Sequence, residues 1–480
     1  MSVAADSATT APRAAPGRLL PALLALACVV VTVGVAVSPT AGVVLAALIA
    51  VTALAVSAPA YAFAGALLMF GLEGTIKMRL TVEGAPDPLA LGAGAIDLAL
   101  VISLLGLLAQ DRGRSLKELW ERFGRSERAV AAAFAGWLAV SLVQIPVGGD
   151  LVDGLEGARL VHFYLLAIPG GIMLAAQLPP RRVEQALLAI TLVIAAYAAF
   201  RGIVGPTEHE REFAESRSTG TYLGEHARDT GSFTSPVAMV SFLVPAAIFA
   251  LVLAWLEATR RVLGALVFVL AMVGVIASYV RTALIATVAG VAALAAMLFV
   301  GRGGSDRFKL VTASMVVLVL AAGYGATLLA GDVDPVAKHR AETLANPFTE
   351  YSVRERLDIW DRALDRAVDQ PLGTGVGTVG RATIEHGRTA VYTDNSYLKI
   401  LQEQGFLGAF LFLFAVLGAV ALCWGRLARA GPASRPLGVA ALVAFTAFLV
   451  LCVMAEYIEQ PGKELVWALL GIAIWEAYGR

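Results

Sequence analysis

Long apolar stretches recur from one end of the chain to the other and alternate with shorter polar ones. As a helix, each stretch is long enough to cross about 30 Å of hydrocarbon, so the pattern predicts a helical membrane bundle. The closely spaced pair at 41–76 is the weakest, and a merged or re-entrant segment there would leave about twelve spans. The fourteen candidate spans are 19–37, 41–57, 59–76, 93–109, 129–147, 158–177, 185–204, 236–256, 262–279, 282–300, 310–330, 396–424, 437–455 and 464–478.

Composition supports this assignment. The 480 residues are 58% hydrophobic and 15% charged, and the mean hydropathy is +0.75. A soluble protein of this size needs far more polar surface. The formal net charge of zero gives no indication of nucleic-acid binding. Cys28, Cys423 and Cys452 lie in apolar runs and are typical of small buried hydrophobes. We therefore expect an all-α polytopic integral membrane protein with about 12–14 transmembrane helices, in contact with membrane lipids and without a nucleic-acid partner.

Lysine and arginine concentrate in alternate short loops, which predicts an orientation. In the fourteen-span arrangement these loops all fall on one side, and the bias of basic residues assigns that side to the cytoplasm. Both termini are then cytoplasmic. The five basic segments are 110–128, 181–184, 257–261, 301–309 and 425–436.

Two long polar segments fall on the opposite, outer side, and loops of this length are usually functional or disordered. The second contains apolar residues at helical spacing over 352–368, which predicts an amphipathic helix on the outer membrane surface. The expected segments are a disordered cytoplasmic leader at 1–17, helices at 18–204, an outer loop at 205–235, helices at 236–330, a large outer catalytic loop at 331–395 and helices at 396–480. The apolar run after the leader could pass for a signal peptide, but the many later spans favour an uncleaved first helix.

A polar pair stands at the mouth of the span at 396–424. Asp394 and Asn395 open it, and Gly405 and Gly408 follow three residues apart. The stretch resembles the loop-to-helix junction of the O-antigen ligase and Wzy-type polymerase family, whose pattern is His, then Asn, Ser or Gln, nine residues, and Gly-x-x-Gly. The spacing matches residue for residue, with Asp394 where the ligases carry His. The alternative is that the polar cluster merely caps the helix, which would not explain its spacing to the glycines.

Two arginines are expected at outer helix ends. Arg228 closes the first outer loop, and Arg281 lies in a very short outer turn between two spans. A guanidinium close to hydrocarbon is costly unless it snorkels or meets an anion, and its planar fork suits phosphate oxygens. The resemblance implies that both bind the diphosphate of a polyprenyl-linked sugar donor. The alternative is that each is a snorkelling interface anchor.

Further positive residues lie on the expected outer side. Arg354, Arg356 and Arg388 run against the usual loop bias, and Arg356 resembles the arginine that precedes Trp in the family's outer helix. Each could equally be a solvated surface residue. Arg159, at the outer end of a span, could complete a basic rim.

Asp394 is the expected general base, because a carboxylate beside a bound diphosphate could accept the proton of an attacking sugar hydroxyl. Asn395 could orient the acceptor or cap the helix. His386, eight residues earlier in the same loop, is the competing base, and His226 is a weaker candidate.

The run from Gly375 to Gly380 fits the Gly-x-Gly-x-x-Gly pattern of dinucleotide-binding proteins. It follows a helical stretch and lacks a βαβ context, so we reject that interpretation. With the preceding Pro371-Leu372-Gly373 it resembles the family's Pro-Leu-Gly-x-Gly turn, which needs glycine for its backbone angles. No metal site is expected, because the outer segments are poor in carboxylates at ligand spacing.

The resemblance extends from Arg228 toward the C-terminus and implies a membrane glycosyltransferase. Such an enzyme would move a glycan from a polyprenyl-diphosphate carrier to a hydroxyl of a glycan or lipid-glycan acceptor, at the outer face of a bacterial cytoplasmic membrane. The family is understood to invert at the anomeric carbon and to need neither metal nor cofactor. Asp394 in place of His favours a polymerase over a ligase. The rival class is a multi-span transporter or flippase of lipid-linked sugars, which typically places ionisable residues near mid-membrane.

Overall fold

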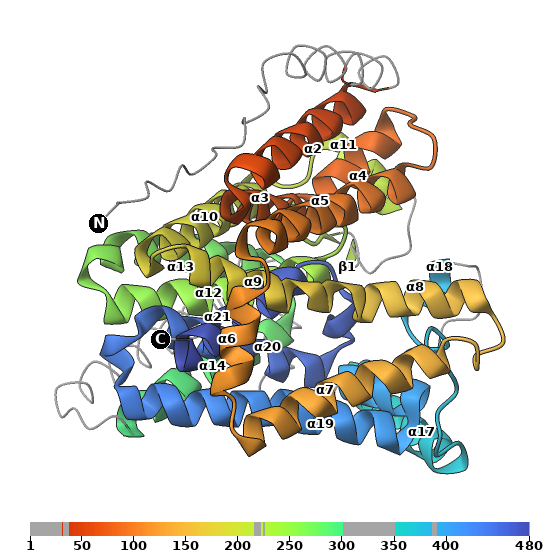
Figure 1. Cartoon of the computed structure of the whole chain (residues 1–480). Coiled ribbons are helices and arrows are strands. Elements are labelled where there is room, and N and C mark those ends of the chain that lie inside the picture. The colour runs from red at the N-terminus through yellow and green to blue at the C-terminus, as the bar shows by residue number, and fades with distance from the viewer. Residues whose placement is uncertain are drawn as a thin grey trace, which may run out of the picture.

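The chain folds into a bundle of helices (Figure 1). The computed structural model describes Val31 and residues 38–215, 222–223, 226–300, 351–385 and 391–479. Within those residues the only sheet is an antiparallel pair of two-residue strands, with Leu223 opposite His226. The all-α expectation is therefore confirmed. The spans predicted at 19–37 and 310–330 lie outside the described residues, apart from Val31.

Proline begins several helices of the N-terminal half, where its missing N–H costs nothing. The stretch predicted as a single span at 59–76 is instead a broken helix, because α3 and α4 meet at an angle of 58°. The elements are α2 (Pro39–Ser57), α3 (Pro59–Gly71), α4 (Glu73–Val82), α5 (Pro88–Asp111), α6 (Arg114–Arg122), α7 (Arg125–Gln144), α8 (Leu151–Val161), η1 (Phe163–Leu166), α9 (Ala167–Gln177), α10 (Pro180–Val204), α11 (Glu208–Glu215), β1 (Tyr222–Leu223) and β2 (His226–Ala227).

The C-terminal half contains the longest helix, α19. Its elements are α12 (Pro236–Leu256), η2 (Ala258–Arg260), α13 (Arg261–Ala277), α14 (Arg281–Val300), α17 (Tyr351–Asp369), α18 (Arg381–Glu385), α19 (Ser396–Ala430), η4 (Pro432–Ser434), α20 (Pro436–Met454), η5 (Tyr457–Glu459) and α21 (Lys463–Tyr478).

The described residues contain ten helices long and apolar enough to cross a membrane, or eleven if the bent α3–α4 pair is one span. The predicted span at 464–478 corresponds to α21, which has 16 residues. At 1.5 Å per residue it covers about 24 Å, less than a hydrocarbon core of about 30 Å. Its residues are nearly all buried among neighbouring helices, so protein and not lipid surrounds it.

The core lies around α12 and α20, whose spans are 89% and 78% buried. Both helices are apolar on every side, as expected of helices enclosed by others. The span of α7 is only 17% buried, so α7 lies at the periphery. Figure 1 shows it beside α19, with α17 near the end of this pair.

The amphipathic helix predicted at 352–368 is α17. Its buried side contains Ala363 and Ala367, each 2% exposed, and Leu357, Leu364 and Val368 are exposed. Gln402 of α19 donates to the Ala363 carbonyl, which joins the two helices. Contact of the exposed side with the outer membrane surface stays a prediction.

Polar connections gather at two ends of the bundle. We call one the loop face, formed by residues 226–235, 278–282, 371–385, 391–395 and 455–462. We call the other the basic face, formed by residues 110–128, 425–436 and 476–479. On the basic face, Arg122 donates to the carbonyls of Tyr478 and Gly479, and Arg426 pairs with Glu127. The predicted assignment of the basic side to the cytoplasm places the loop face outside.

Candidate active site

Asn395 caps α19. Its Oδ1 accepts hydrogen bonds from the backbone N of Tyr397 at 2.8 Å and of Leu398 at 3.1 Å. Asp394, one residue earlier, has φ of 46°, in the left-handed region that aspartate tolerates better than most residues. The cap therefore belongs to Asn395, and in the described hydrogen bonds Asp394 takes no part in it.

The Asp394 carboxylate lies beside α17. Its Oδ2 is 3.5 Å from Nε of Arg356, and the Asp394 side chain keeps 39% of its surface exposed. The Arg356 Nε is buried and makes no hydrogen bond among the described residues. A reachable carboxylate thus stands next to the Arg356 cation. The pair joins two predicted site residues that are 38 positions apart in sequence.

The loop between α20 and α21 holds Asp394 in place. Thr393 donates to Glu456 Oε1 from its backbone N at 2.8 Å and from its hydroxyl at 2.7 Å. Burial, followed by the negative charge of Glu459, raises the pKa of Glu456 to about 7. The Ser396 hydroxyl donates to the Ala455 carbonyl. Asp394 therefore lies between two anchored residues.

Arg228 and the turn before Arg281 are in contact. Nε of Arg228 donates to the Ser278 carbonyl at 2.9 Å, and the backbone N of Asp229 donates to the Ala277 carbonyl at 3.2 Å. Tyr279 has φ of 54°, which turns the chain sharply between α13 and α14. Ser278, to which Arg228 is bonded, lies three positions before Arg281, the first residue of α14.

Tyr457 joins the two halves of the site. Its hydroxyl lies 3.1 Å from the hydroxyl of Thr282, which follows Arg281, and its chain neighbour is the Glu456 that binds Thr393. Burial raises the pKa of Tyr457 to about 12, and the positive charges of Arg228 and Arg356 act against this rise. The loop face thus carries Arg228, Arg281 and Asp394, and Asp394 pairs with Arg356 of α17.

The other predicted residues lie apart or are not described. Arg354 is exposed on α17. Arg159 does not begin its span but lies within Leu151–Gln177. Its guanidinium is 2.7 Å from both Asp97 and Glu156, so two carboxylates already compensate its charge. His386 and Arg388 lie outside the described residues, and the side chain of His226 in β2 is not described.

The glycine-rich turn docks on a break in α19. Gly373, Gly375, Gly377 and Gly380 have φ between 83° and 103°, which agrees with the prediction that this turn needs glycine. Gly405 is non-helical, with φ of 67° and ψ of −173°. The backbone N of Phe406 donates to the Pro371 carbonyl, and that of Gly375 donates to the Glu403 carbonyl, both at 3.0 Å. The spacing of Gly405 from Asp394 thus fixes where the turn can bind.

We expect Gly405→Ala to destabilise the protein by roughly 1–3 kcal/mol, because the added Cβ would be strained at positive φ. It would also lie 2.3 Å from the Pro371 carbonyl oxygen. Gly425→Ala is the matched control in the same helix, since its Cβ would meet nothing closer than Arg429 at 4.0 Å. Thermal unfolding in detergent measures the difference. Equal melting temperatures for the two variants would show that the break at Gly405 is not required.

A buried ionic cluster supports this junction, and the sequence analysis missed it. Lys399 is fully buried, and its Nζ lies 2.6 Å from Glu403 Oε1 and 2.8 Å from Glu459 Oε1. Glu403 Oε1 also accepts hydrogen bonds from the backbone N of Gly377 at 2.9 Å and of Val379 at 3.2 Å. The available signal was Lys and Glu four residues apart in the first turns of an otherwise apolar helix.

Asp229 was also overlooked. Its Oδ1 accepts a hydrogen bond from the backbone N of Gly231 at 2.8 Å, and its Oδ2 is buried without a described partner. Burial raises the pKa of Asp229 to about 7. The positive charge of Arg201 acts against this rise. Its position directly after Arg228 was the only sequence signal.

A match to a known family covers the centre of this site. Residues 266–413 match the family model described as O-antigen ligase. The resemblance stated from the Asp394 motif is confirmed there, and the O-antigen ligase region contains Arg281, Arg356 and Asp394 but not Arg228. No curated protein matches the chain.

The match to the O-antigen ligase family model, together with the polytopic helical fold, supports a membrane enzyme that joins glycans. It also supports a lipid-linked glycan as substrate and a bacterial inner membrane as the location.

Proposed function

We propose that this protein transfers or polymerises a glycan from a polyprenyl-diphosphate carrier onto an acceptor hydroxyl at the outer face of the cytoplasmic membrane. The observation that carries the proposal is the carboxylate of Asp394, exposed at the loop face 3.5 Å from Arg356 and within the O-antigen ligase region. Both termini would lie in the cytoplasm.

The proposed reaction is a displacement at the anomeric carbon. The acceptor oxygen attacks that carbon while Asp394 accepts the hydroxyl proton, and the bond from the anomeric carbon to the diphosphate oxygen breaks. Attack from the face opposite the leaving group inverts the configuration. The polyprenyl diphosphate leaves with the bond's electron pair, and Arg228 and Arg281 bind its oxygens and neutralise the charge that develops.

Arg356 and Asn395 are assigned supporting roles. Arg356 would hold the Asp394 carboxylate through its Nε side and offer its terminal N–H groups to an acceptor or a phosphate oxygen. Asn395, whose Oδ1 is occupied by the cap, would fix the chain direction at Asp394. Arg354 and His386 remain candidates for contacts at the rim, and no step is routed through a metal ion.

A polymerase that extends one lipid-linked glycan with another is favoured over transfer to a lipid core. Asp394 stands where the ligases carry His, which supports this choice. A comparison of lipid-linked glycan with lipid-glycan acceptors in one assay would distinguish the two.

The decisive experiment uses purified full-length protein in detergent with a labelled lipid-linked oligosaccharide. We expect longer products, because transfer needs no second compartment. We expect Arg228→Gln and Arg281→Gln each to lower kcat/KM by about 10- to 100-fold, the loss of one charge-assisted contact. Arg211→Gln, on exposed α11, is the matched control and should leave kcat/KM unchanged.

Two outcomes would contradict the proposal. Absence of products in detergent, combined with movement of the labelled lipid between leaflets in proteoliposomes, would identify a transporter. Equal kcat/KM for Arg228→Gln, Arg281→Gln and Arg211→Gln would remove the two arginines from the donor site.

A further inference from the structure

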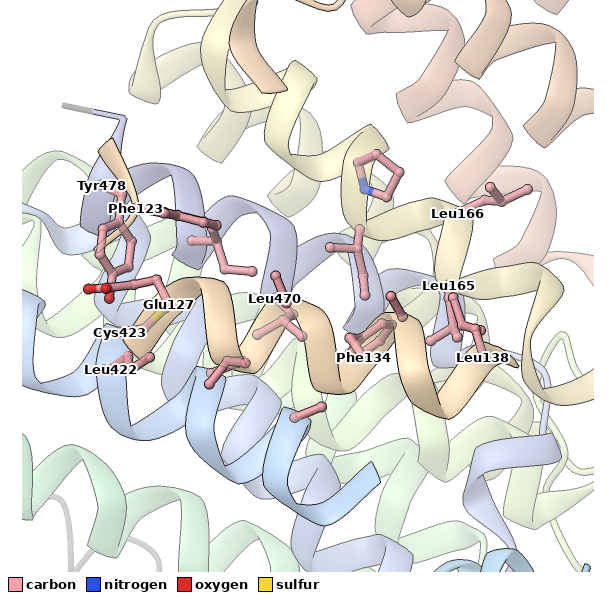
Figure 2. Close-up of a pocket in the computed structure, with 18 of the residues that line it drawn as sticks. Phe123, Glu127, Phe134, Leu138, Leu165, Leu166, Leu422, Cys423, Leu470 and Tyr478 are labelled. Atoms are coloured by element: carbon pink, nitrogen blue, oxygen red, sulfur yellow. The ribbon is translucent and has the colours of Figure 1, made fainter. Parts of the chain in front are cut away.

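A large apolar cavity lies away from the candidate active site. It has a volume of about 450 Å³ and is enclosed by α7, the segment from His162 to Pro169, α19 and α21. This volume is within the range of small-molecule sites. Figure 2 shows Phe123, Glu127 and Tyr478 together at one end and Leu138 and Leu165 at the other. Along α7 the two ends, at Glu127 and Leu138, are separated by about 16 Å, from a rise of 1.5 Å per residue.

The middle of the cavity is lined by small and apolar side chains. Ala131, Phe134 and Ala135 of α7 face Ala415 and Ala419 of α19 across it. The polar lining residues lie at the ends, with Glu127 and Tyr478 at one and His162, beside the ring of Trp137, at the other. A hydrocarbon chain is the ligand that makes contacts along such a surface, because an empty cavity forfeits dispersion contacts.

The cavity is accessible from the bilayer. It lies on α7, whose span is only 17% buried, and its rim includes Leu166, which is 41% exposed. In a membrane, the surroundings of such a rim are lipid chains. An acyl chain can therefore enter from the side without passing through the protein.

The mouth at Tyr478 opens on the basic face. Segments 110–128 and 425–436 together contain nine basic and four acidic residues. Arg426 lies over the Tyr478 ring, 4.3 Å from its centroid, and 3.3 Å from Glu127. The Tyr478 side chain lies beside Glu127 at this mouth. Positive charge thus stands where a chain leaving the cavity would end.

We propose that this cavity binds one chain of an anionic phospholipid from the leaflet at the basic face, with the phosphate at Arg426. Basic pockets between transmembrane helices hold anionic headgroups in this way. The donor's polyprenyl diphosphate is a poorer fit, because its charged end is needed at the loop face, at the opposite end of the bundle. This exclusion of the donor rests on the proposed function.

Native mass spectrometry of the detergent-purified full chain tests it, with phosphatidylglycerol and phosphatidylcholine added separately. We expect tighter retention of phosphatidylglycerol. Arg426→Gln should weaken that retention about fivefold, the effect of about one basic residue at a membrane surface. Arg429→Gln, exposed one turn further along α19, is the matched control and should retain the lipid like the wild type. Ala419→Trp, which fills the middle of the cavity, should abolish the tightly bound adduct.

Three results would overturn the proposal. Equal retention of the two lipids would indicate general detergent-resistant lipid. Unchanged phosphatidylglycerol retention in Arg426→Gln would remove the headgroup assignment, and this exposed variant gives an answer even if Ala419→Trp fails to fold. A co-purified adduct with the mass of a polyprenyl phosphate, displaced by Ala419→Trp, would assign the cavity to the donor instead.

Discussion

Asp394→Asn should reduce the turnover of glycan transfer by about 10²- to 10⁴-fold, the usual contribution of a positioned general base. The amide cannot accept the acceptor's proton, but it keeps the shape of the carboxylate. Asparagine also tolerates the left-handed backbone at φ of 46°. Loss of activity would therefore report on chemistry rather than on strain. Transfer rates at saturating donor and acceptor give kcat, and we expect the donor KM to change little.

The matched control is Asp358→Asn, an exposed aspartate on α17. It should leave kcat unchanged. Thermal stability of Asp394→Asn should stay close to wild type, because Asn395 and not Asp394 caps α19. If Asp394→Asn retains most of its turnover and His386→Ala loses it, then His386 is the base. If neither variant loses turnover, base catalysis from this loop is ruled out.

Local sequence patterns were sufficient to predict the helix α17 and most spans within the described residues, with 59–76 and 464–478 as exceptions. They also predicted the glycine turn, because glycine is the residue that most readily adopts the positive φ found at Gly373 and Gly375. The Asp394 motif placed the carboxylate at the start of α19. Its spacing to Gly405 has a physical meaning that sequence alone did not reveal. Gly405 breaks the helix so that Phe406 can bind the Pro371 carbonyl.

Pairings between distant residues could not be predicted in this way. Arg159 looked available for a basic rim, but its partner Asp97 lies 62 positions away. No proline marks the bend between α3 and α4 in the sequence. The bend is caused by packing. The Gly74 Cα approaches Phe233 so closely that a Cβ would lie 2.0 Å from the Phe233 carbonyl carbon. Burial of a charged residue is likewise a property of the assembled fold, so the sequence did not identify Lys399 as part of a buried ionic cluster.

Lys399→Met should destabilise the folded protein by about 3–5 kcal/mol, the usual cost of removing one partner from a buried ion pair. Glu403 and Glu459 would then be left as two carboxylates without their shared cation, at 1% and 0% side-chain exposure. Thermal unfolding in detergent, with the yield of monodisperse protein, measures the loss. The matched control is Lys117→Met, since Lys117 and Glu121 form the same i,i+4 pair at 77% and 62% exposure. An exposed pair contributes about 0–1 kcal/mol, so this variant should melt close to wild type.

Neutralising both carboxylates together with the lysine separates the effect of charge from the effect of side-chain shape. Lys399→Met combined with Glu403→Gln and Glu459→Gln should recover much of the lost stability, because no unpaired charge then remains buried. The glutamine at 403 can still accept the hydrogen bonds from Gly377 and Val379, so the glycine turn should stay docked. If Lys399→Met melts like Lys117→Met, the two carboxyls must already be neutral in the folded protein. If the triple variant is no more stable than Lys399→Met, the lysine acts through packing, and the charge argument fails.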